Sequence, residues 1–248
     1  MTETFALRDV HNFRDLGGLE TVDGGRTHYG VLFRSDSFHE AGQDDIDHLA
    51  RTVGIRCIVD LRAAREVDAD GRNPRWPDTV AYHHFPLAGG PGGAIEGAPS
   101  GERLALRYLE YLRDCADSVI GAVRAVVEAG GRPAVLHCRA GKDRTGVVVA
   151  LILAAVGVRP EAVAADYQLT TEGMKKIMER LRASPTYAAN VRRLPAEMYS
   201  SDAPTMLAFL GLLQKEYGGA ADYLLSHGVD QATLDRLDAI LVQRTTEV

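Results

Sequence analysis

The stretch from 133 to 156 restricts the fold of this chain more than any other. A strand-like run at 133–137 leads into the loop HCRAGKDRTG at 137–146, and an uninterrupted apolar run at 147–156 follows. A strand, a glycine-containing loop and a helix in this order bring backbone N–H groups and a helix N-terminus together, and this geometry binds phosphate. We therefore expect an anion site in the loop and a buried helix after it.

The charges of the loop support the same expectation. Arg139, Lys142 and Arg144 lie close together, and like charges at this spacing repel one another unless an anion binds between them. The nucleotide-binding P-loop fits poorly, because Leu136 stands where its first glycine is required and Asp143 stands where Ser or Thr should follow the lysine. The loop is therefore not expected to bind a nucleotide.

The cysteine of the loop, Cys138, lies six residues before Arg144. Cationic surroundings and a helix N-terminus favour the thiolate of such a cysteine, and a thiolate can attack phosphorus. Arg144 can hold two phosphoryl oxygens with one guanidinium group. Thr145 is a candidate N-cap of the following helix, and its hydroxyl is a candidate contact of the thiolate. The expected phosphate-binding residues are Arg139, Ala140, Gly141, Lys142, Asp143, Arg144 and Thr145.

Composition excludes several other classes of protein. The net charge of −6 at pH 7 disfavours binding to nucleic acid or to anionic lipid, because both require a basic surface. Three cysteines at wide spacings, without a CxxC pair, argue against a disulfide framework or a zinc finger. The first residues resemble no Sec signal peptide, and 147–156 is far shorter than the ~20 residues that cross a bilayer. We expect a cytoplasmic protein without an integral membrane segment, although export by another route and the oligomeric state stay open.

Periodicity and turn residues predict strands that alternate with helices in the first part of the chain and helices alone later. Strands are expected at 29–33, 55–62, 79–85 and 133–137. Helices are expected at 43–52, 63–69, 104–112, 120–128, 147–156, from 160 onward, at 204–217 and at 231–242. The Gly- and Pro-rich segment at about 87–101 is typical of a mobile surface loop. This pattern predicts one α/β domain over 1–248, with a helical C-terminal portion from about 160.

The loop HCRAGKDRTG resembles the signature of the cysteine-dependent phosphatases. Basic residues at Arg139 and Lys142 are similar to the loop of phosphoinositide 3-phosphatases, whereas Asp143 directly before the arginine resembles the bacterial tyrosine/serine phosphatase family. Further motifs of that family are Asn12-Phe13-Arg14-Asp15-Leu16-Gly17-Gly18, Leu32-Phe33-Arg34-Ser35, Asp60-Leu61-Arg62 with Glu66, and Ala165-Asp166-Tyr167.

This resemblance covers nearly the whole chain. It implies a mainly parallel central sheet flanked by helices, a cysteinyl-phosphate intermediate, and neither a metal nor a cofactor. The best-known members of the family are mycobacterial enzymes of broad specificity that also hydrolyse phosphoinositides. The resemblance also implies a catalytic role for Asp143.

A general acid must protonate the leaving oxygen, and a water must later be activated. Asp143 is the first candidate for this role. The tripeptide Trp76-Pro77-Asp78 matches the acid loop of the eukaryotic tyrosine phosphatases, but it precedes a strand instead of following one, and we interpret it as a turn. The family acid after Phe-Pro is absent, because Leu87 follows Phe85-Pro86. This leaves Asp143 or a residue carried by the loop at 87–101, in which Glu96 is the acid.

Several polar residues are expected to support the loop from behind: Asn12, Arg14, Asp15, Asp60, Arg62 and His137. Asp60 and Arg62 follow a buried strand, so they form either part of the site or an ion-paired turn that holds the sheet edge. His137 directly precedes the cysteine on a strand, so its ring is expected to point away from the phosphate.

These residues predict a phosphatase of the protein-tyrosine-phosphatase type, with Cys138 as nucleophile, Arg144 as phosphate ligand and Asp143 as acid and base. Phosphotyrosine is the expected substrate, and phosphoserine, phosphothreonine and phosphoinositides are further candidates. Two alternatives remain at this point. One is a module that binds phosphorylated ligands without hydrolysing them, and the other is a sulfurtransferase in which Cys138 carries a persulfide.

Overall fold

The computed structural model describes residues 7–88, 100–184 and 200–244. Its central sheet has five strands in the order β1-β3-β6-β4-β5. The strands are β1 (Arg14–Asp15), β3 (Leu32–Ser35), β6 (Ala134–His137), β4 (Cys57–Asp60) and β5 (Ala81–His84). Only β1 runs antiparallel to its neighbour, so the sheet is mainly parallel, as expected.

The register of the sheet places the ends of three parallel strands side by side. Ser35 of β3 and Asp60 of β4 both pair with His137, the last residue of the middle strand β6. Carboxyl ends of parallel strands form one edge of the sheet, where open α/β folds place their sites. The loop that follows His137 therefore begins between two neighbouring strand ends.

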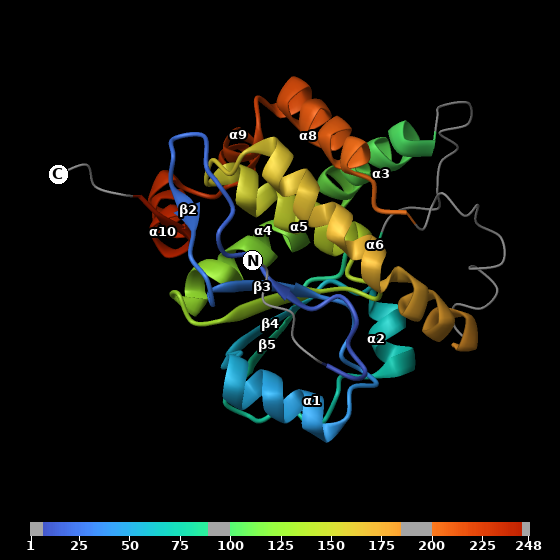
Figure 1. The fold of residues 1–248 in the computed structure, drawn as a ribbon. Coiled ribbons are helices and arrows are strands. Elements are labelled where there is room, and N and C mark those ends of the chain that lie inside the picture. Colours follow the sequence, from blue (N-terminus) through green and yellow to red (C-terminus); the bar gives the residue numbers. More distant parts are fainter. Residues whose placement is uncertain (1–6, 89–99, 185–199, 245–248) are drawn as a thin grey trace.

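Helices cover both faces of this sheet. The helices of the described ranges are α1 (Gln43–Asp47) with the π-helical segment η1 (His48–Val53), α2 (Ala64–Asp70), α3 (Ser100–Asp114), α4 (Ala116–Ala129), α5 (Asp143–Ala155), α6 (Pro160–Ala183), α8 (Ala203–Tyr217), α9 (Ala220–Ser226) and α10 (Gln231–Leu241). Helix α1 lies on one side of the sheet, and α4, α5 and α6 lie on the other (Figure 1). Within the described ranges, no helix is long and apolar enough to span a membrane.

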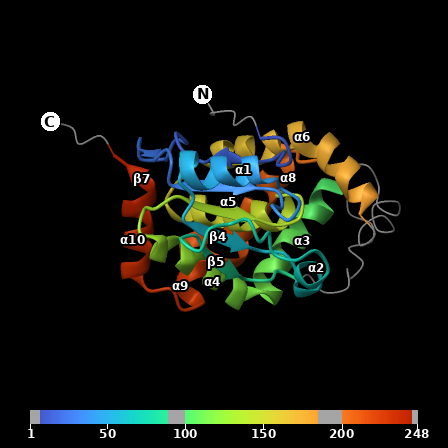
Figure 2. The same cartoon turned by 90° about the horizontal axis from the view of Figure 1, so that it is seen from below.

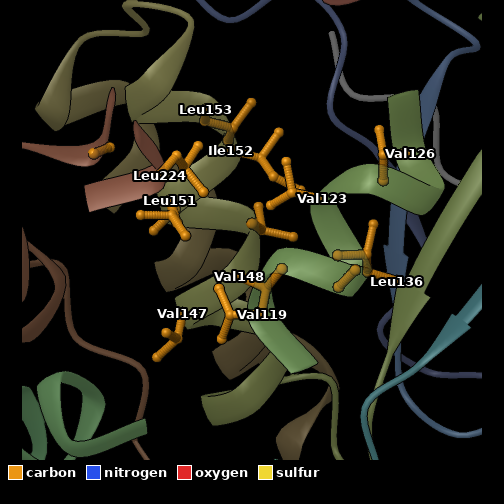
Figure 3. Packing of buried hydrophobic residues seen from close by; sticks show 14 of the residues in the cluster. Val119, Val123, Val126, Leu136, Val147, Val148, Leu151, Ile152, Leu153 and Leu224 are labelled. Atoms are coloured by element: carbon orange, nitrogen blue, oxygen red, sulfur yellow. The ribbon is translucent and has the colours of Figure 1, made fainter. Parts of the chain in front are cut away.

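Helix α5 is the centre of the larger core. Its residues from Thr145 to Leu153 are all buried, because apolar side chains surround the helix on every side. Valines of α4 and Leu136 of β6 pack against one flank of α5, and Leu224 of α9 lies at another (Figure 3). Burial on all sides fixes the direction of α5, and with it the position of its N-terminus.

A second, smaller core lies on the opposite face. It joins Ile46 and Leu49 of the α1–η1 segment to Phe33 of β3 and to Trp76. The ring of Trp76 packs edge-on against Phe38 at 5.4 Å between centroids. Trp76 is thus a core residue on the side of the sheet that carries α1.

A short second sheet joins a segment of the N-terminal region to one near the C-terminal end of the described residues. It consists of β2 (Arg26–Thr27) and β7 (Val242–Gln243), which pair in antiparallel fashion. In Figure 2, β7 and α10 lie at one end of the molecule, and α2 and the C-terminal end of α6 lie at the other. The described C-terminal residues are therefore tied to the N-terminal region.

Most expected elements are confirmed, including the strands at 55–62, 79–85 and 133–137 and the helix opened by Pro160. The first strand begins later than expected, at Leu32. The sequence did not predict α9. It also did not predict the short strands β1, β2 and β7, because a two-residue strand is defined by its partner and not by a local pattern. Most of the expected mobile loop, 89–99, lies outside the described residues.

Candidate active site

Cys138 directly follows the middle strand, and it is only 2% exposed. The N–H of Leu61, just beyond β4, donates to the carbonyl of His137 at 2.8 Å, which joins the two strand ends next to the cysteine. Helix α5 begins five residues later, at Asp143. The first N–H groups of a helix have no acceptor within it, so this end of α5 attracts an anion.

The expected cap of α5 was wrong. Lys142 occupies the N-cap position, and Thr145 is already the third residue of the helix. Its hydroxyl oxygen is buried and has no hydrogen-bond partner in the described part of the chain, so the expected contact with the thiolate is not formed here. Thr145 remains a candidate phosphate ligand.

Arg144 is held by Glu66 of α2. Both guanidinium Nη atoms of Arg144 bind this carboxylate, and Nη2 lies 3.0 Å from Oε1. Glu66 also accepts the N–H of Ala63 at 2.7 Å, which closes the first turn of α2. Burial lowers the pKa of Arg144, but its electrostatic interaction with Cys138 and its hydrogen bonds to the Glu66 carboxylate outweigh burial and raise the pKa above its usual value. Arg144 is therefore a fixed cation next to Cys138.

Asn12 and Arg34 hold the carbonyl groups of the loop. Asn12 donates from Nδ2 to the carbonyl oxygens of Ala140 and Gly141, each at 3.1 Å. Arg34 donates from Nη2 to the same Gly141 oxygen at 2.7 Å. Because a peptide group is planar, fixing its C=O on one side directs its N–H to the other. These bonds thus orient the loop amides, and the expected bracing role of Asn12 has a concrete geometry.

Gly141 fits this arrangement because it lacks a side chain. Its φ of +66° lies in the left-handed region, and a Cβ here would lie 2.3 Å from the carbonyl oxygen of Ser35. The loop can therefore approach β3 closely only with glycine at this position.

A buried carboxylate, Asp166 of α6, connects the two arginines behind the loop. Arg14 Nε and Arg34 Nη1 each lie 2.6 Å from one of its oxygens. Burial raises the pKa of Asp166, but the two guanidinium groups outweigh this effect and bring the pKa below its ordinary value. Arg14 also binds the side-chain oxygen of Asn12. Arg34 and Asp166 thus complete the support of the loop, although the sequence marked them only as parts of family motifs.

Helix α6 also contacts the loop directly. Its buried stripe of Met174, Ile177, Met178 and Leu181 packs against Ala140, so the methionines are core residues. Further along the helix, Arg180 donates to Asp36 at 2.7 Å, and Asp36 accepts the N–H of Asn12 at 3.0 Å.

Asp143 is the first residue of α5, and its side chain is 36% exposed. Its Oδ1 accepts a hydrogen bond of 2.6 Å from the hydroxyl of Tyr108 and one of 3.0 Å from Nζ of Lys142. Burial raises the pKa of Asp143, but Lys142, Tyr108 and Arg144 together lower it below its usual value. Asp143 is therefore a carboxylate at neutral pH.

The other two cations of the loop are buried in ion pairs. Arg139 binds Asp70, one turn beyond Glu66 on the same face of α2, and lies 3.2 Å from the Ser184 hydroxyl. Lys142 binds Asp143. These side chains are thus held by carboxylates of the chain itself, whereas the sequence suggested that they face the substrate.

The remaining predicted residues lie away from the loop interior. Asp60 and Arg62 form a buried ion pair at the end of β4, with Nη2 and Oδ2 2.6 Å apart. The ring of His137 points toward Asp60 and Phe38, on the face opposite α5, as its position on the strand predicted. Asp15 accepts the N–H groups of Gly17 and Gly30, so it stabilises a turn.

Within the described residues, the other positions considered for the acid do not contribute an acidic group to the loop. Trp76 lies in the smaller core on the far side of the sheet, and Asp78, two residues later, is exposed, as expected for a turn. Leu87 is buried in the main core, so the position of the family acid contributes to packing. Glu96 lies outside the described residues.

A mainly parallel sheet with a cysteine-to-arginine loop between the middle strand and a buried helix defines the class of cysteine-dependent phosphatases. A family model described as the tyrosine phosphatase family matches residues 5–243. The chain therefore belongs to the tyrosine phosphatase family, and it is a phosphatase of the protein-tyrosine-phosphatase type.

Two relatives whose names identify them as phosphatases agree with this assignment. The triple specificity protein phosphatase PtpB of Mycobacterium tuberculosis is 28% identical and aligns with 95% of this chain and 98% of its own length. A putative tyrosine-protein phosphatase of Cupriavidus necator, H16_A0669, is 30% identical over 65% of this chain and 61% of its own. Among solved structures, the Siw14 catalytic core aligns with 79% of this chain and 92% of its own, with 13% identity and a TM-score of 0.38.

Proposed function

We propose that this chain hydrolyses phosphomonoesters through a cysteinyl-phosphate intermediate. The thiolate of Cys138 attacks phosphorus, an S–P bond forms, and the P–O bond to the alcohol or phenol breaks. Arg144 binds two of the phosphoryl oxygens, together with the loop amides of 139–145. The observation that carries this proposal is the position of Cys138 beside a charged Arg144, at the N-terminus of a helix buried on all sides.

Proton transfer is assigned to Asp143. It is the acidic residue of the loop itself, and its partial exposure gives water access to the carboxyl group. Asn12, Arg14, Arg34 and Asp166 support the loop and do not take part in the chemistry. Neither a metal nor a cofactor is required by these steps.

Phosphotyrosine is the proposed primary substrate, with phosphoserine, phosphothreonine or phosphoinositides as further substrates. The similarity to a triple specificity phosphatase supports this range. In the ion pairs described above, Arg139 and Lys142 face carboxylates, so a second phosphate on the substrate would have to compete with Asp70 and Asp143. We expect the enzyme to prefer esters with one phosphate.

We also propose that 1–248 acts as a single phosphatase domain in the cytoplasm. The need for a thiolate at Cys138 supports a reducing compartment, because an oxidising compartment would oxidise the active-site thiol. The net charge of −6 supports a phosphorylated protein or small ester as partner over nucleic acid.

The test is hydrolysis of p-nitrophenyl phosphate by the wild type and by Cys138→Ser, with Cys57→Ser as the matched control. Cys57 is buried in the main core, and burial raises its pKa to about 11, so it is an unreactive thiol. We expect turnover in the wild type and in Cys57→Ser and none in Cys138→Ser. Binding of phosphate esters without turnover by the wild type would favour the binding module, and thiocyanate formation from thiosulfate and cyanide would favour a sulfurtransferase.

A further inference from the structure

Two buried tyrosines form a chain of hydroxyl groups that ends on Asp143. The hydroxyl of Tyr108 lies 2.6 Å from Asp143 Oδ1 and 2.6 Å from the hydroxyl of Tyr167. A phenol has one proton to donate, and the carboxylate can only accept. The proton of Tyr108 therefore goes to Asp143, and Tyr167 donates to the oxygen of Tyr108.

Packing fixes this pair in place. Both tyrosine side chains are fully buried, on α3 and α6 respectively. The two rings meet edge-on, with 6.2 Å between centroids, and Phe209 of α8 packs edge-on against Tyr108 at 5.8 Å. Three helices thus hold the hydroxyl groups, while the loop supplies Asp143.

Both side-chain hydrogen bonds that the structure describes at Asp143 go to the same carboxylate oxygen. Tyr108 and Lys142 both donate to Oδ1, whereas Oδ2 accepts no hydrogen bond from the residues that the structure describes. The side chain is also 36% exposed. One oxygen is therefore anchored in the protein, and the other can accept a proton from water.

The surroundings of Asp143 favour its charged form. Lys142 and Arg144, in its own segment, both lower the pKa of Asp143, and Tyr108, Tyr111 and Tyr167 lie close to it on α3 and α6. Burial raises the pKa of Tyr108 well above its usual value, and the charge of Asp143 raises it further, so the phenol stays a donor. The pKa of Tyr167 is raised chiefly by burial, with the same result.

We propose that Tyr108 and Tyr167 are positioning residues that keep Asp143 a carboxylate with one oxygen open to water, so that Asp143 acts chiefly as the base that releases the cysteinyl phosphate. In this step, Oδ2 takes a proton from water while the water oxygen forms a bond to phosphorus. The P–S bond breaks, and the electron pair returns to sulfur as the thiolate. The inference rests on the proposed function, since it requires that intermediate.

The inference separates the two halves of the reaction. Formation of the cysteinyl phosphate from p-nitrophenyl phosphate needs no proton donor, because nitrophenolate leaves as an anion. Its decay needs the base. Loss of the Tyr108 hydroxyl should therefore slow decay and leave formation unchanged.

The experiment measures both steps by rapid quench between about pH 2.5 and pH 7 in the wild type, Tyr108→Phe, Tyr167→Phe and Tyr223→Phe, because the pKa of Asp143 lies below its usual value. In Tyr108→Phe, we expect the acid limb of the decay rate to move to higher pH. On that limb, the rate of decay should fall about tenfold, which corresponds to the loss of ~1.4 kcal/mol of hydrogen bonding to the carboxylate. Tyr167→Phe should shift the limb in the same direction by less. Tyr223→Phe is the matched control, because its buried hydroxyl also makes a 2.7 Å hydrogen bond, to Leu112, but does not contact Asp143.

A second readout does not depend on activity. Titration of the Asp143 carboxyl by carbon-13 NMR should show a higher pKa in Tyr108→Phe than in the wild type, whether or not the protein turns over an ester. Three results would overturn the inference while the phosphatase assignment stands. They are coincident titration curves of Asp143 in well-folded variants, equal slowing of both chemical steps, and an equal shift of the acid limb in Tyr223→Phe. A wild type that forms no phosphoenzyme would instead refute the proposed function.

Discussion

Arg34 and Gly141 are 107 positions apart, yet the guanidinium of Arg34 donates to the carbonyl oxygen of Gly141 at 2.7 Å. The same guanidinium binds Asp166, so one buried arginine connects β3, the phosphate loop and α6. This relationship explains how a loop of polar backbone keeps one shape between three elements.

The first prediction concerns Arg34 itself. Arg34→Lys keeps the charge but cannot reach Asp166 and Gly141 together, because an ammonium lacks the planar fork. We expect kcat/KM for p-nitrophenyl phosphate to fall about tenfold to a hundredfold, the equivalent of losing one charge-assisted hydrogen bond of ~1.5–3 kcal/mol. Arg26→Lys alters an exposed pair with Glu20 and should leave kcat/KM unchanged. An unaffected Arg34→Lys enzyme would show that the Gly141 contact is not needed for catalysis.

The second prediction concerns the stability provided by Asp166. Asp166→Asn leaves two buried arginines without their carboxylate, which should reduce the free energy of unfolding by about 3–5 kcal/mol. The pKa of Asp166 is lowered in the folded state, so its contribution is present above the unfolded value of about 3.9 and is lost as the pH falls below it. Urea unfolding at pH 7 and at about pH 2.5 should therefore show a difference between wild type and variant that narrows at the lower pH.

Asp23→Asn is the control for that experiment, because Asp23 forms an exposed ion pair with Arg244. We expect almost no change in its unfolding free energy. A loss in Asp166→Asn no larger than in this control would contradict the prediction.

The third prediction tests the ion pair between Asp70 and Arg139. Asp70→Asn removes the carboxylate charge that pairs with Arg139, so a second phosphate has less competition for this guanidinium group. We expect KM for a multiply phosphorylated inositol lipid headgroup to fall relative to KM for phosphotyrosine. Asp68→Asn removes an exposed charge from the same helix and accounts for the general change in charge. If both variants alter the two KM values equally, Arg139 has no part in selecting substrates.

The fourth prediction concerns Gly141. Gly141→Ala forces a Cβ to within 2.3 Å of the Ser35 carbonyl oxygen at a positive φ, so the loop must move away from β3. We expect at least a hundredfold loss of kcat, because misplacement by about 1 Å already has such an effect. Gly71→Ala has a similar φ of +75° but open space around it, so it should lower stability and leave kcat unchanged. Circular dichroism of both variants would separate a displaced loop from a general loss of folding.

The sequence alone predicted a site at Cys138 and Arg144, together with the order of the elements around them. These features are local: a strand-like run, a glycine-containing loop and an apolar run of ten residues specify their structure within one short segment. The buried helix α5 and the stripe on α6 follow from the same principle, since side-chain periodicity is set by the helix itself.

Only the tertiary structure determined which groups the buried polar side chains contact. Arg34 lies in an unremarkable strand, and Tyr108 lies on an ordinary amphipathic helix, so neither segment shows which group it will meet. Their contacts with Gly141 and Asp143 form only when distant segments pack together, and the same packing turned Arg139 toward Asp70 instead of toward a substrate. Buried polar groups must find partners wherever the fold brings them, and that choice depends on the position of the whole chain in space.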